Sequence, residues 1–250
     1  MQSLSLMPMR LLTAGGQSSG EISERRPRDD FQWNVASTLN LLVIAERLKI
    51  KKFVYASSMG IYGECKKETF REEDAGRPIS IYGAGKLAAE TYLGTFASRG
   101  MTNISLRMFN VYGPGQNLEN QLQGMVSIFL SQLLQTGRVM VRGSLERVRD
   151  FVYIDDIVSA WRKSIYTDAL AEGFYAFNVG SGVGTTVGRL LEIFKQFAGS
   201  FDIEVTGGTP KDQFATISCN TKIRNALGWE PKVGLEEGLH RFWEWGRKVS

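Results

Sequence analysis

Residues 52–56, with the sequence KFVYA, and the SSMGIYG that follows them decide the fold class of this 250-residue chain. The apolar start predicts a short buried strand, and the Ser, Gly and Tyr residues predict a turn at its carboxyl end. A helix is predicted next, after the N-cap Ser80 and before Gly100, and a second buried strand covers 104–108. A strand, a long helix and a strand in this order predict a parallel α/β sheet.

The alternation of helices and strands continues over most of the chain. Apolar spacing predicts a helix from Asp29 to Lys49. Further helices are predicted at 122–134, 156–165, 187–197 and 235–245, and further strands at 139–141, 151–153 and 175–178. The pattern favours a parallel sheet covered by helices on both faces. Because the chain becomes loop-like after about Gly113, we expect a first domain over residues 1–115. A smaller lobe, interleaved with the end of the sheet, is expected over residues 116–250.

Composition restricts the classes of function. The chain has 30 basic and 26 acidic residues, a net charge of +4, and its basic residues are spread along the sequence. This distribution argues against a nucleic-acid surface, although it suits a pocket for a phosphorylated ligand. A single histidine, His240, leaves little material for a zinc site or a histidine relay.

The sequence predicts a cytoplasmic protein. No apolar run approaches the roughly 20 residues that span a bilayer, and residues 1–12 lack the features of a signal peptide. The two cysteines, Cys65 and Cys219, are therefore interpreted as reduced thiols.

Tyr82 and Lys86 form the strongest chemical signal. Side chains four residues apart on a helix project from the same face. A nearby ammonium favours the phenolate, so we expect the pKa of Tyr82 to fall below its usual value of about 10. Such a tyrosine can act as a general base toward a sugar hydroxyl. Tyr-x-x-x-Lys is frequent by chance, and the alternative is a tyrosine beside a solvated lysine.

The two predicted strands bring further side chains to the same place. Ligands bind at the carboxyl ends of the strands in a parallel sheet. Short polar or aromatic pairs follow the strands at 52–56 and 104–108. The predicted cluster consists of Ser57, Ser58, Tyr82, Lys86, Phe109 and Asn110.

Four ordered motifs resemble those of the NAD-dependent epimerases and dehydratases, an extended short-chain dehydrogenase/reductase family that includes the UDP-glucose 4-epimerases. They are Ser-Ser-x-x-x-Tyr-Gly from Ser57, Tyr-x-x-x-Lys from Tyr82, Leu-Arg-x-Phe-Asn-Val-Tyr-Gly-Pro-Gly from Leu106, and Arg-Asp-Phe-Val-Tyr-Ile-Asp-Asp from Arg149. The likeness extends from about Gln17 to the C-terminus. It implies a Rossmann-like sheet, NAD as cofactor and a C-terminal lobe that binds a nucleotide-sugar, with a homodimer expected through the helix that carries Tyr82.

The resemblance also implies residue roles. The residues that match catalytic positions are Ser58, Tyr82 and Lys86. Those that match NAD contacts are Asn34, Ser57, Tyr82, Lys86 and Phe109. Those that match contacts to the nucleotide-sugar are Ser58, Asn110 and Arg149.

Structural alternatives stay open for several of these residues. Asn34 could simply brace its helix, Phe109 could be core packing, and Arg149 could form a surface ion pair. Asp155 and Asp156 are interpreted as caps of the following helix rather than as an acid/base pair.

Met59 and Gly60 narrow the implied reaction. The family's 4,6-dehydratases carry an acidic pair at these positions, and neither Met nor Gly can donate a proton, so dehydration is disfavoured. The implied reaction is 4-epimerisation of a UDP-glucose or UDP-galactose type substrate. In it, Tyr82 removes the C4 hydroxyl proton as hydride passes to NAD⁺, and hydride then returns to the other face of the keto-sugar.

One unit of the family is not found in the sequence. Members begin with a strand, a glycine-rich turn and a helix that hold the dinucleotide phosphates. Residues 9–20 resemble that opening but lack its middle glycine, and residues 14–20 match a later loop of the family better. Roughly 60 to 70 residues of a typical member are therefore expected to be absent or to lie in another chain. Two alternatives stay open: a non-catalytic fragment or pseudoenzyme that binds nucleotide-sugars, and an NAD(P)-dependent sugar-nucleotide oxidoreductase.

Overall fold

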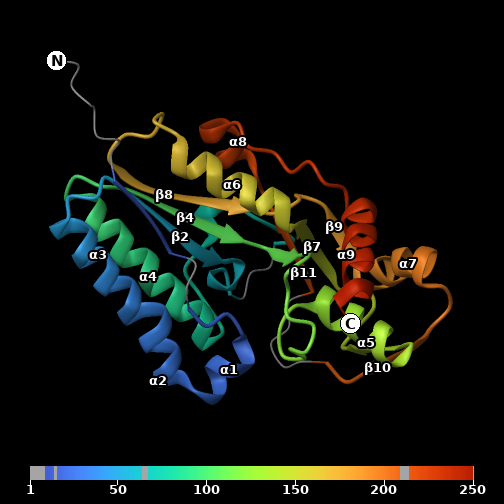
Figure 1. Ribbon diagram of the computed structural model, residues 1–250. Coiled ribbons are helices and arrows are strands. Elements are labelled where there is room, and N and C mark those ends of the chain that lie inside the picture. The colour runs from blue at the N-terminus through green and yellow to red at the C-terminus, as the bar shows by residue number, and fades with distance from the viewer. Residues whose placement is uncertain (1–8, 14–15, 64–66, 209–213, 250) are drawn as a thin grey trace.

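Four parallel strands form the main sheet of the computed structural model, which describes residues 9–13, 16–63, 67–208 and 214–249. In their order across the sheet they are β1 (Arg10–Thr13), β2 (Lys52–Ser58), β4 (Thr102–Met108) and β8 (Gly173–Val179). Helices α3 (Ser37–Arg47) and α4 (Ile81–Ala97) cover one face (Figure 1). Helices α6 (Ile154–Tyr166) and α8 (Thr221–Leu227) cover the other. The predicted parallel sheet with helices on both faces is confirmed.

Alternate side chains of the central strands enter two separate cores. Phe53 packs with residues of α3 and α4, whereas Val54 packs with residues of α6 and α8. Successive residues of a strand point to opposite faces, so a strand buried on both faces needs an apolar run without alternation. The sequence of β2 has that character, and this is why it could be recognised as a buried strand.

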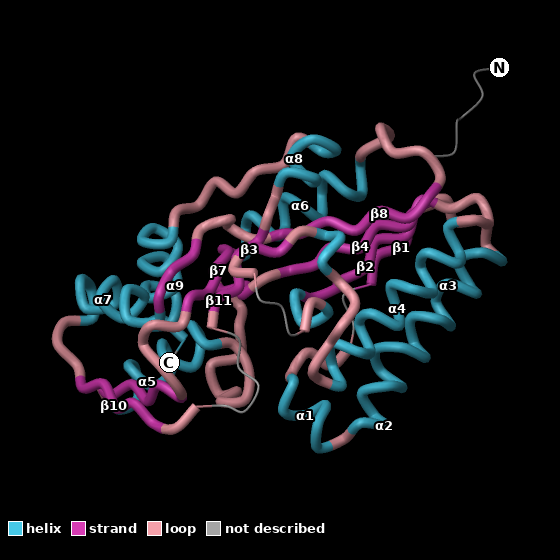
Figure 2. Tube along the Cα trace, turned by 180° about the vertical axis from the view of Figure 1, so that it is seen from behind, coloured by secondary structure: helices cyan, strands magenta, loops and turns pink. Residues whose placement is uncertain are grey.

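A second set of elements forms the lobe at the end of the molecule away from α3 (Figure 2). Its strands are β3 (Thr69–Phe70), β5 (Asn110–Tyr112), β6 (Arg138–Arg142), β7 (Val148–Tyr153), β9 (Gly184–Thr186), β10 (Asp202–Thr206) and β11 (Ala215–Ser218). Its helices are α5 (Met125–Thr136), α7 (Val187–Ala198) and α9 (Leu235–Val249). Because β8 returns to the main sheet after β7, the chain interleaves the two parts.

The helix predicted from Asp29 to Lys49 is divided in the structure. It consists of α2 (Pro27–Asp30), a π-helical segment η1 (Phe31–Ala36) and α3, and it follows the short helix α1 (Gly20–Arg25). The hydroxyls of Ser37 and Thr38 donate to backbone carbonyls four residues earlier. These hydroxyls compete with backbone N–H groups for the same carbonyls, at the point where the helix adopts the wider π-helical turn of η1.

Helix α4 begins where the sequence predicts. Ser80 is its N-cap, and the Ser80 hydroxyl accepts a hydrogen bond from the Gly83 N–H at 3.0 Å. Two 3₁₀ turns, η2 (Met59–Ile61) and η3 (Glu72–Asp74), flank the carboxyl end of β2 and the entrance to α4.

A buried ion pair fastens α4 to the sheet. Arg107 on β4 and Glu90 on α4 lie 2.7 Å apart, and their side chains are 6% and 2% exposed. The Arg107 guanidinium also donates to the Tyr62 hydroxyl at 3.2 Å and to the Glu72 carbonyl at 2.7 Å. Burial alone would lower the pKa of Arg107, but the hydrogen bonds and charge of Glu90 raise it. The pair therefore joins α4, β4 and the turn after β2.

Within the described ranges, no helix is both long and apolar enough to cross a membrane. Cys219 is a half-buried free thiol, and Cys65 lies outside the described residues.

Candidate active site

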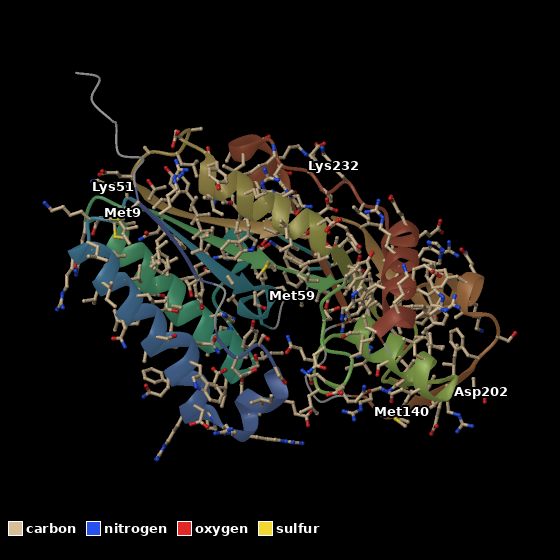
Figure 3. The ribbon with its side chains drawn as sticks, viewed as in Figure 1. Met9, Lys51, Met59, Met140, Asp202 and Lys232 are labelled. Atoms are coloured by element: carbon tan, nitrogen blue, oxygen red, sulfur yellow. The ribbon has the colours of Figure 1, made fainter. Side chains whose placement is uncertain are left out.

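A cavity of about 800 Å³ lies between the main sheet and the lobe. It is bounded by the carboxyl ends of β2 and β4, the start of α4, and α6 on the sheet side, and by the start of α5 on the lobe side. Met59, one of its lining residues, is labelled in Figure 3 and lies between the main sheet and the lobe. The predicted site residues that line the cavity are Ser57, Ser58, Tyr82, Lys86, Phe109 and Asn110. Asn34 and Arg149 are not among its lining residues.

Ser58 and Tyr82 face each other across Gly60. A Cβ atom added to Gly60 would lie 3.5 Å from both Ser58 Oγ and Tyr82 Cδ1. Ser58 Oγ also accepts the Gly60 N–H at 3.1 Å, which fixes the hydroxyl at the end of β2. The turn after β2 therefore positions the serine against the tyrosine.

Gly83 permits the close approach of α4 to this turn. A Cβ atom at Gly83 would lie 2.2 Å from the backbone oxygen of Gly60.

Gly83→Ala is expected to lower the free energy of unfolding by about 1–3 kcal/mol, because the backbone must shift to accept the methyl group. Denaturant unfolding measures the change. Gly94→Ala is the matched control, since its nearest neighbour would be 3.9 Å away and alanine favours a helix interior. Equal stabilisation of both variants would contradict the close approach.

Lys86 is held in a buried position between two aromatic rings. Lys86 is only 4% exposed, and its Nζ donates a hydrogen bond to the Ala56 carbonyl at 3.0 Å. The ammonium lies 4.9 Å from the ring centroid of Tyr55 and 5.6 Å from that of Tyr82. Burial lowers the pKa of Lys86 to about 8, while the charges of Asp30 and Glu90 oppose the change. The lysine therefore titrates close to neutral pH.

The prediction that Lys86 lowers the pKa of Tyr82 is wrong for this structure. Desolvation raises the pKa of Tyr82, a hydrogen bond with Ser58 opposes the rise, and the charge of Asp30 adds to it. The physical reason is that removing water from a phenolate outweighs its attraction to an ammonium already engaged by the Ala56 carbonyl. Burial therefore keeps Tyr82 in its neutral, protonated form at neutral pH.

Asn34 is a buried bracing residue with one unused acceptor. It is 1% exposed, and Nδ2 donates to the Gln17 carbonyl and to Asp30 Oδ1, both at 2.9 Å. Asn34 Oδ1 is buried and accepts no hydrogen bond from the residues that the structure describes. A Cβ atom on Gly16, a cavity-lining residue, would lie 2.6 Å from this oxygen.

Arg149 lies on β7 of the lobe and is 6% exposed, so it is a buried residue and not a surface one. Its Nη1 donates to the carbonyls of Val148 at 2.8 Å and Phe214 at 3.3 Å. Burial lowers the pKa of Arg149 to about 10, and the charge of Arg147 adds to this effect.

Phe109 and Asn110 combine packing with exposure to the cavity. Phe109 is 4% exposed and packs in a cluster with Tyr62, with ring centroids 6.3 Å apart, yet it also lines the cavity. Asn110 is half-buried, and its Nδ2 donates to the Asp150 carbonyl at 3.0 Å.

The capping role predicted for Asp155 and Asp156 is wrong. Tyr153 is the N-cap of α6, and no side chain caps the helix. The Asp156 carboxylate instead accepts two backbone N–H groups, at Lys232 and Val233, at 2.9 and 3.0 Å. Both aspartates lie in the first turn of α6, where a negative charge interacts favourably with the helix dipole. Neither residue lines the cavity.

Several polar residues near the cavity were not predicted from the sequence. Gln17, Gln116 and Gln123 line it. Gln123 Nε2 also donates to Ser18 Oγ at 2.7 Å and so joins the loop after β1 to the loop before α5. The buried Asp30 was missed as well, although its position four residues before Asn34 on a predicted helix placed the two side chains together.

The residues present fit the nicotinamide end of NAD. Ser57 Oγ lines the cavity and, like Asn34 Oδ1, is buried without a hydrogen-bond partner among the described residues. Ribose hydroxyls both donate and accept, so they could satisfy these two groups. A second cavity of about 480 Å³ shares Gly16 and Gln17 with the first and continues along the carboxyl end of β1.

The fold and the site together define a class of protein. A parallel Rossmann-like sheet carries Ser, Tyr and Lys at its carboxyl edge, which is the arrangement of the short-chain dehydrogenases and reductases. The model of the NAD dependent epimerase/dehydratase family matches residues 7–180. This chain belongs to that family.

Three relatives illustrate the similarity. The UDP-glucose 4-epimerase of Mycolicibacterium smegmatis is 32% identical over 240 residues, which cover 93% of this chain and 75% of the relative. The crystal structure of the Thermotoga maritima UDP-glucose 4-epimerase with UDP-glucose is 36% identical, with a TM-score of 0.90 over 97% of this chain and 78% of that one. The Thermus thermophilus UDP-glucose 4-epimerase in complex with NAD is 32% identical, with a TM-score of 0.87 over 97% and 79% of the respective chains.

Proposed function

We propose that this protein is a nucleotide-sugar 4-epimerase that uses NAD and acts on UDP-sugars of the glucose and galactose type. The observation that carries the proposal is the meeting of Ser58, Tyr82 and Lys86 in one cavity, with Met59 and Gly60 beside them. These two neighbours offer no acid for eliminating water, so the site has groups for moving a hydroxyl proton only. The similarity to UDP-glucose 4-epimerases supports the choice of sugar and nucleotide.

Tyr82 and Ser58 act on the reacting hydroxyl. The Ser58 hydroxyl, held by the Gly60 N–H, binds the C4 oxygen while Tyr82 takes its proton and later returns it. To accept that proton Tyr82 must first be the phenolate, and Lys86, which lies behind the Tyr82 ring, stabilises this form. The chemistry that NAD supplies when bound is the reversible acceptance of a hydride.

The remaining predicted residues bind and orient. Ser57 and Phe109, which line the cavity, are assigned to the nicotinamide end of NAD, together with Asn34, whose Oδ1 lies beside the lining residue Gly16. Asn110 is assigned to the nucleotide-sugar. For Arg149, the proposal requires the guanidinium to exchange its bonds to the Val148 and Phe214 carbonyls for bonds to the diphosphate.

Isothermal titration with UDP-glucose and NAD⁺ tests the proposal against a non-catalytic sugar-binding protein. The purified chain is first denatured and its extract chromatographed for co-purified nucleotide. We expect UDP-glucose binding together with bound or titratable NAD at micromolar affinity. Binding of UDP-glucose by a folded protein that neither retains nor binds NAD would contradict the proposal and favour the non-catalytic alternative.

A further inference from the structure

Asp30 is a buried carboxylate to which the proposed function gives no role. It is the last residue of α2 and is 1% exposed. Its Oδ1 accepts three hydrogen bonds, from Ser23 Oγ at 2.7 Å, Asn34 Nδ2 at 2.9 Å and Gln17 Nε2 at 3.0 Å. Its Oδ2 is equally buried and accepts none from the residues that the structure describes.

A buried carboxylate with one unpartnered oxygen needs a compensating positive charge. In the described part of the chain, no Lys or Arg lies within ion-pair distance of Asp30. Helix α4 passes beside the free oxygen, because a Cβ atom on Gly85 would lie 3.1 Å from Oδ2. The next residue of that helix is Lys86, which is also buried.

Asp30 is the carboxylate near Lys86 whose charge is not already balanced by an arginine. The titratable groups around the lysine are Asp30, Glu90, Tyr55 and Tyr82. Glu90 is bound by Arg107 through several hydrogen bonds, at distances down to 2.7 Å. The two tyrosines are neutral below their raised pKa values. In agreement, Asp30 is the larger of the two charges that raise the pKa of Lys86 against its burial.

We propose that Asp30 is a positioning residue of this site, whose carboxylate keeps Lys86 in its ammonium form and fixes the amide of Asn34. The bond from Asn34 Nδ2 to Asp30 Oδ1, with the second bond to the Gln17 carbonyl, leaves Asn34 Oδ1 free beside Gly16. An ammonium at Lys86 is the form that stabilises a phenolate on Tyr82. Asp30 thus acts through Lys86 and Asn34 and does not touch the reacting atoms. The inference concerns the site of the proposed function, but its test needs neither substrate nor NAD.

The protonation of Lys86 is measured by NMR on protein labelled with ¹³C and ¹⁵N at lysine. The signal is assigned by its loss in Lys86→Met. In the unmodified protein we expect a midpoint of about 8. In Asp30→Asn we expect the midpoint to fall by about one pH unit or more, a tenfold loss in the protonation equilibrium. The fall follows because removing a nearby negative charge disfavours the ammonium, while burial continues to act.

Asp29→Asn is the matched control, since Asp29 precedes Asp30 and its partly exposed carboxylate pairs with Arg26. It should leave the Lys86 midpoint within about 0.2 pH unit of the unmodified protein. An unchanged midpoint in a folded Asp30→Asn protein would overturn the inference, because loss of a purely structural carboxylate would not move it.

A second measurement uses the unmodified protein and so stands even if Asp30→Asn does not fold. The ¹³Cγ signal of the Asp30 carboxylate should shift at the same midpoint as Lys86, because the two charges sense each other. That step should disappear in Lys86→Met. An Asp30 signal that stays flat through the titration of Lys86 would also overturn the inference, whatever the outcome of the binding test for the proposed function.

Discussion

Tyr82→Phe is expected to lower the kcat for interconversion of UDP-galactose and UDP-glucose by about 10²- to 10⁴-fold. The phenolic oxygen is the group that removes and returns the C4 hydroxyl proton in the proposed function. The ring itself is retained, so packing and the contact of the Lys86 ammonium with the ring should persist. We therefore expect the KM and the cooperativity of unfolding to change little. Initial rates at saturating UDP-galactose and NAD⁺ measure the effect.

Tyr92→Phe is the matched control for this experiment. Tyr92 lies on the same helix, α4, but is 37% exposed and does not line the cavity. Its loss of a hydroxyl should leave kcat unchanged. A Tyr82→Phe protein that retains most of the unmodified rate would rule out Tyr82 as the group that moves the proton.

Arg107→Met is expected to lower the free energy of unfolding by about 3–5 kcal/mol, the usual cost of leaving one member of a buried ion pair alone. The substitution keeps a long apolar side chain but leaves the Glu90 carboxylate, 2% exposed, without its guanidinium. It also removes the donor to the Tyr62 hydroxyl and the Glu72 carbonyl. Urea unfolding, followed by circular dichroism, measures the loss.

A double-mutant cycle separates the ion pair from general packing. Glu90→Gln removes the charge that Arg107→Met leaves behind, so the double variant should lose less stability than the sum of the two single variants. Arg189→Met serves as the control, because Arg189 pairs with Glu236 at 2.9 Å on an exposed surface and should contribute about 1 kcal/mol or less. Strict additivity of the cycle would show that the buried pair is not coupled as the structure implies.

The sequence predicts helix α4 and the strands beside it because local chemistry and tertiary packing agree there. Ser80 offers a cap and Gly100 offers a stop. The β2 run is mostly apolar on both faces, and β4 carries the apolar residues Ile104, Leu106 and Met108 on one face. Strands β10 and β11 could not be predicted in this way. In β10 the apolar residues Ile203 and Val205 alternate over five largely exposed residues only, which is too short a pattern to identify a strand, and its pairing with β6 depends on contacts distant in sequence.

The candidate site shows the same difference between features that follow from the sequence pattern and features that depend on tertiary packing. The residues that gather at the strand ends follow from topology, and this is why the cluster around Tyr82 was predicted. The direction of the Tyr82 pKa shift was not predicted, because residue spacing places a lysine nearby but does not reveal how deeply the phenol is buried. Asp30 was missed for a similar reason. Its partners Gln17 and Ser23 lie just before and on the short helix α1, and their contact with Asp30 depends on how α1 packs beside α2.

The measurement that tests the account most directly is product analysis after incubating the purified chain with UDP-galactose and NAD⁺. Proton NMR distinguishes the axial from the equatorial hydroxyl at C4, and absorbance at 340 nm follows any net NADH. We predict the appearance of UDP-glucose until a constant ratio is reached, with no net NADH, because the hydride is returned to the sugar. Steady accumulation of NADH with a keto-sugar would instead identify an oxidoreductase. Absence of any conversion by a folded protein shown to bind both ligands would contradict the proposed epimerase function.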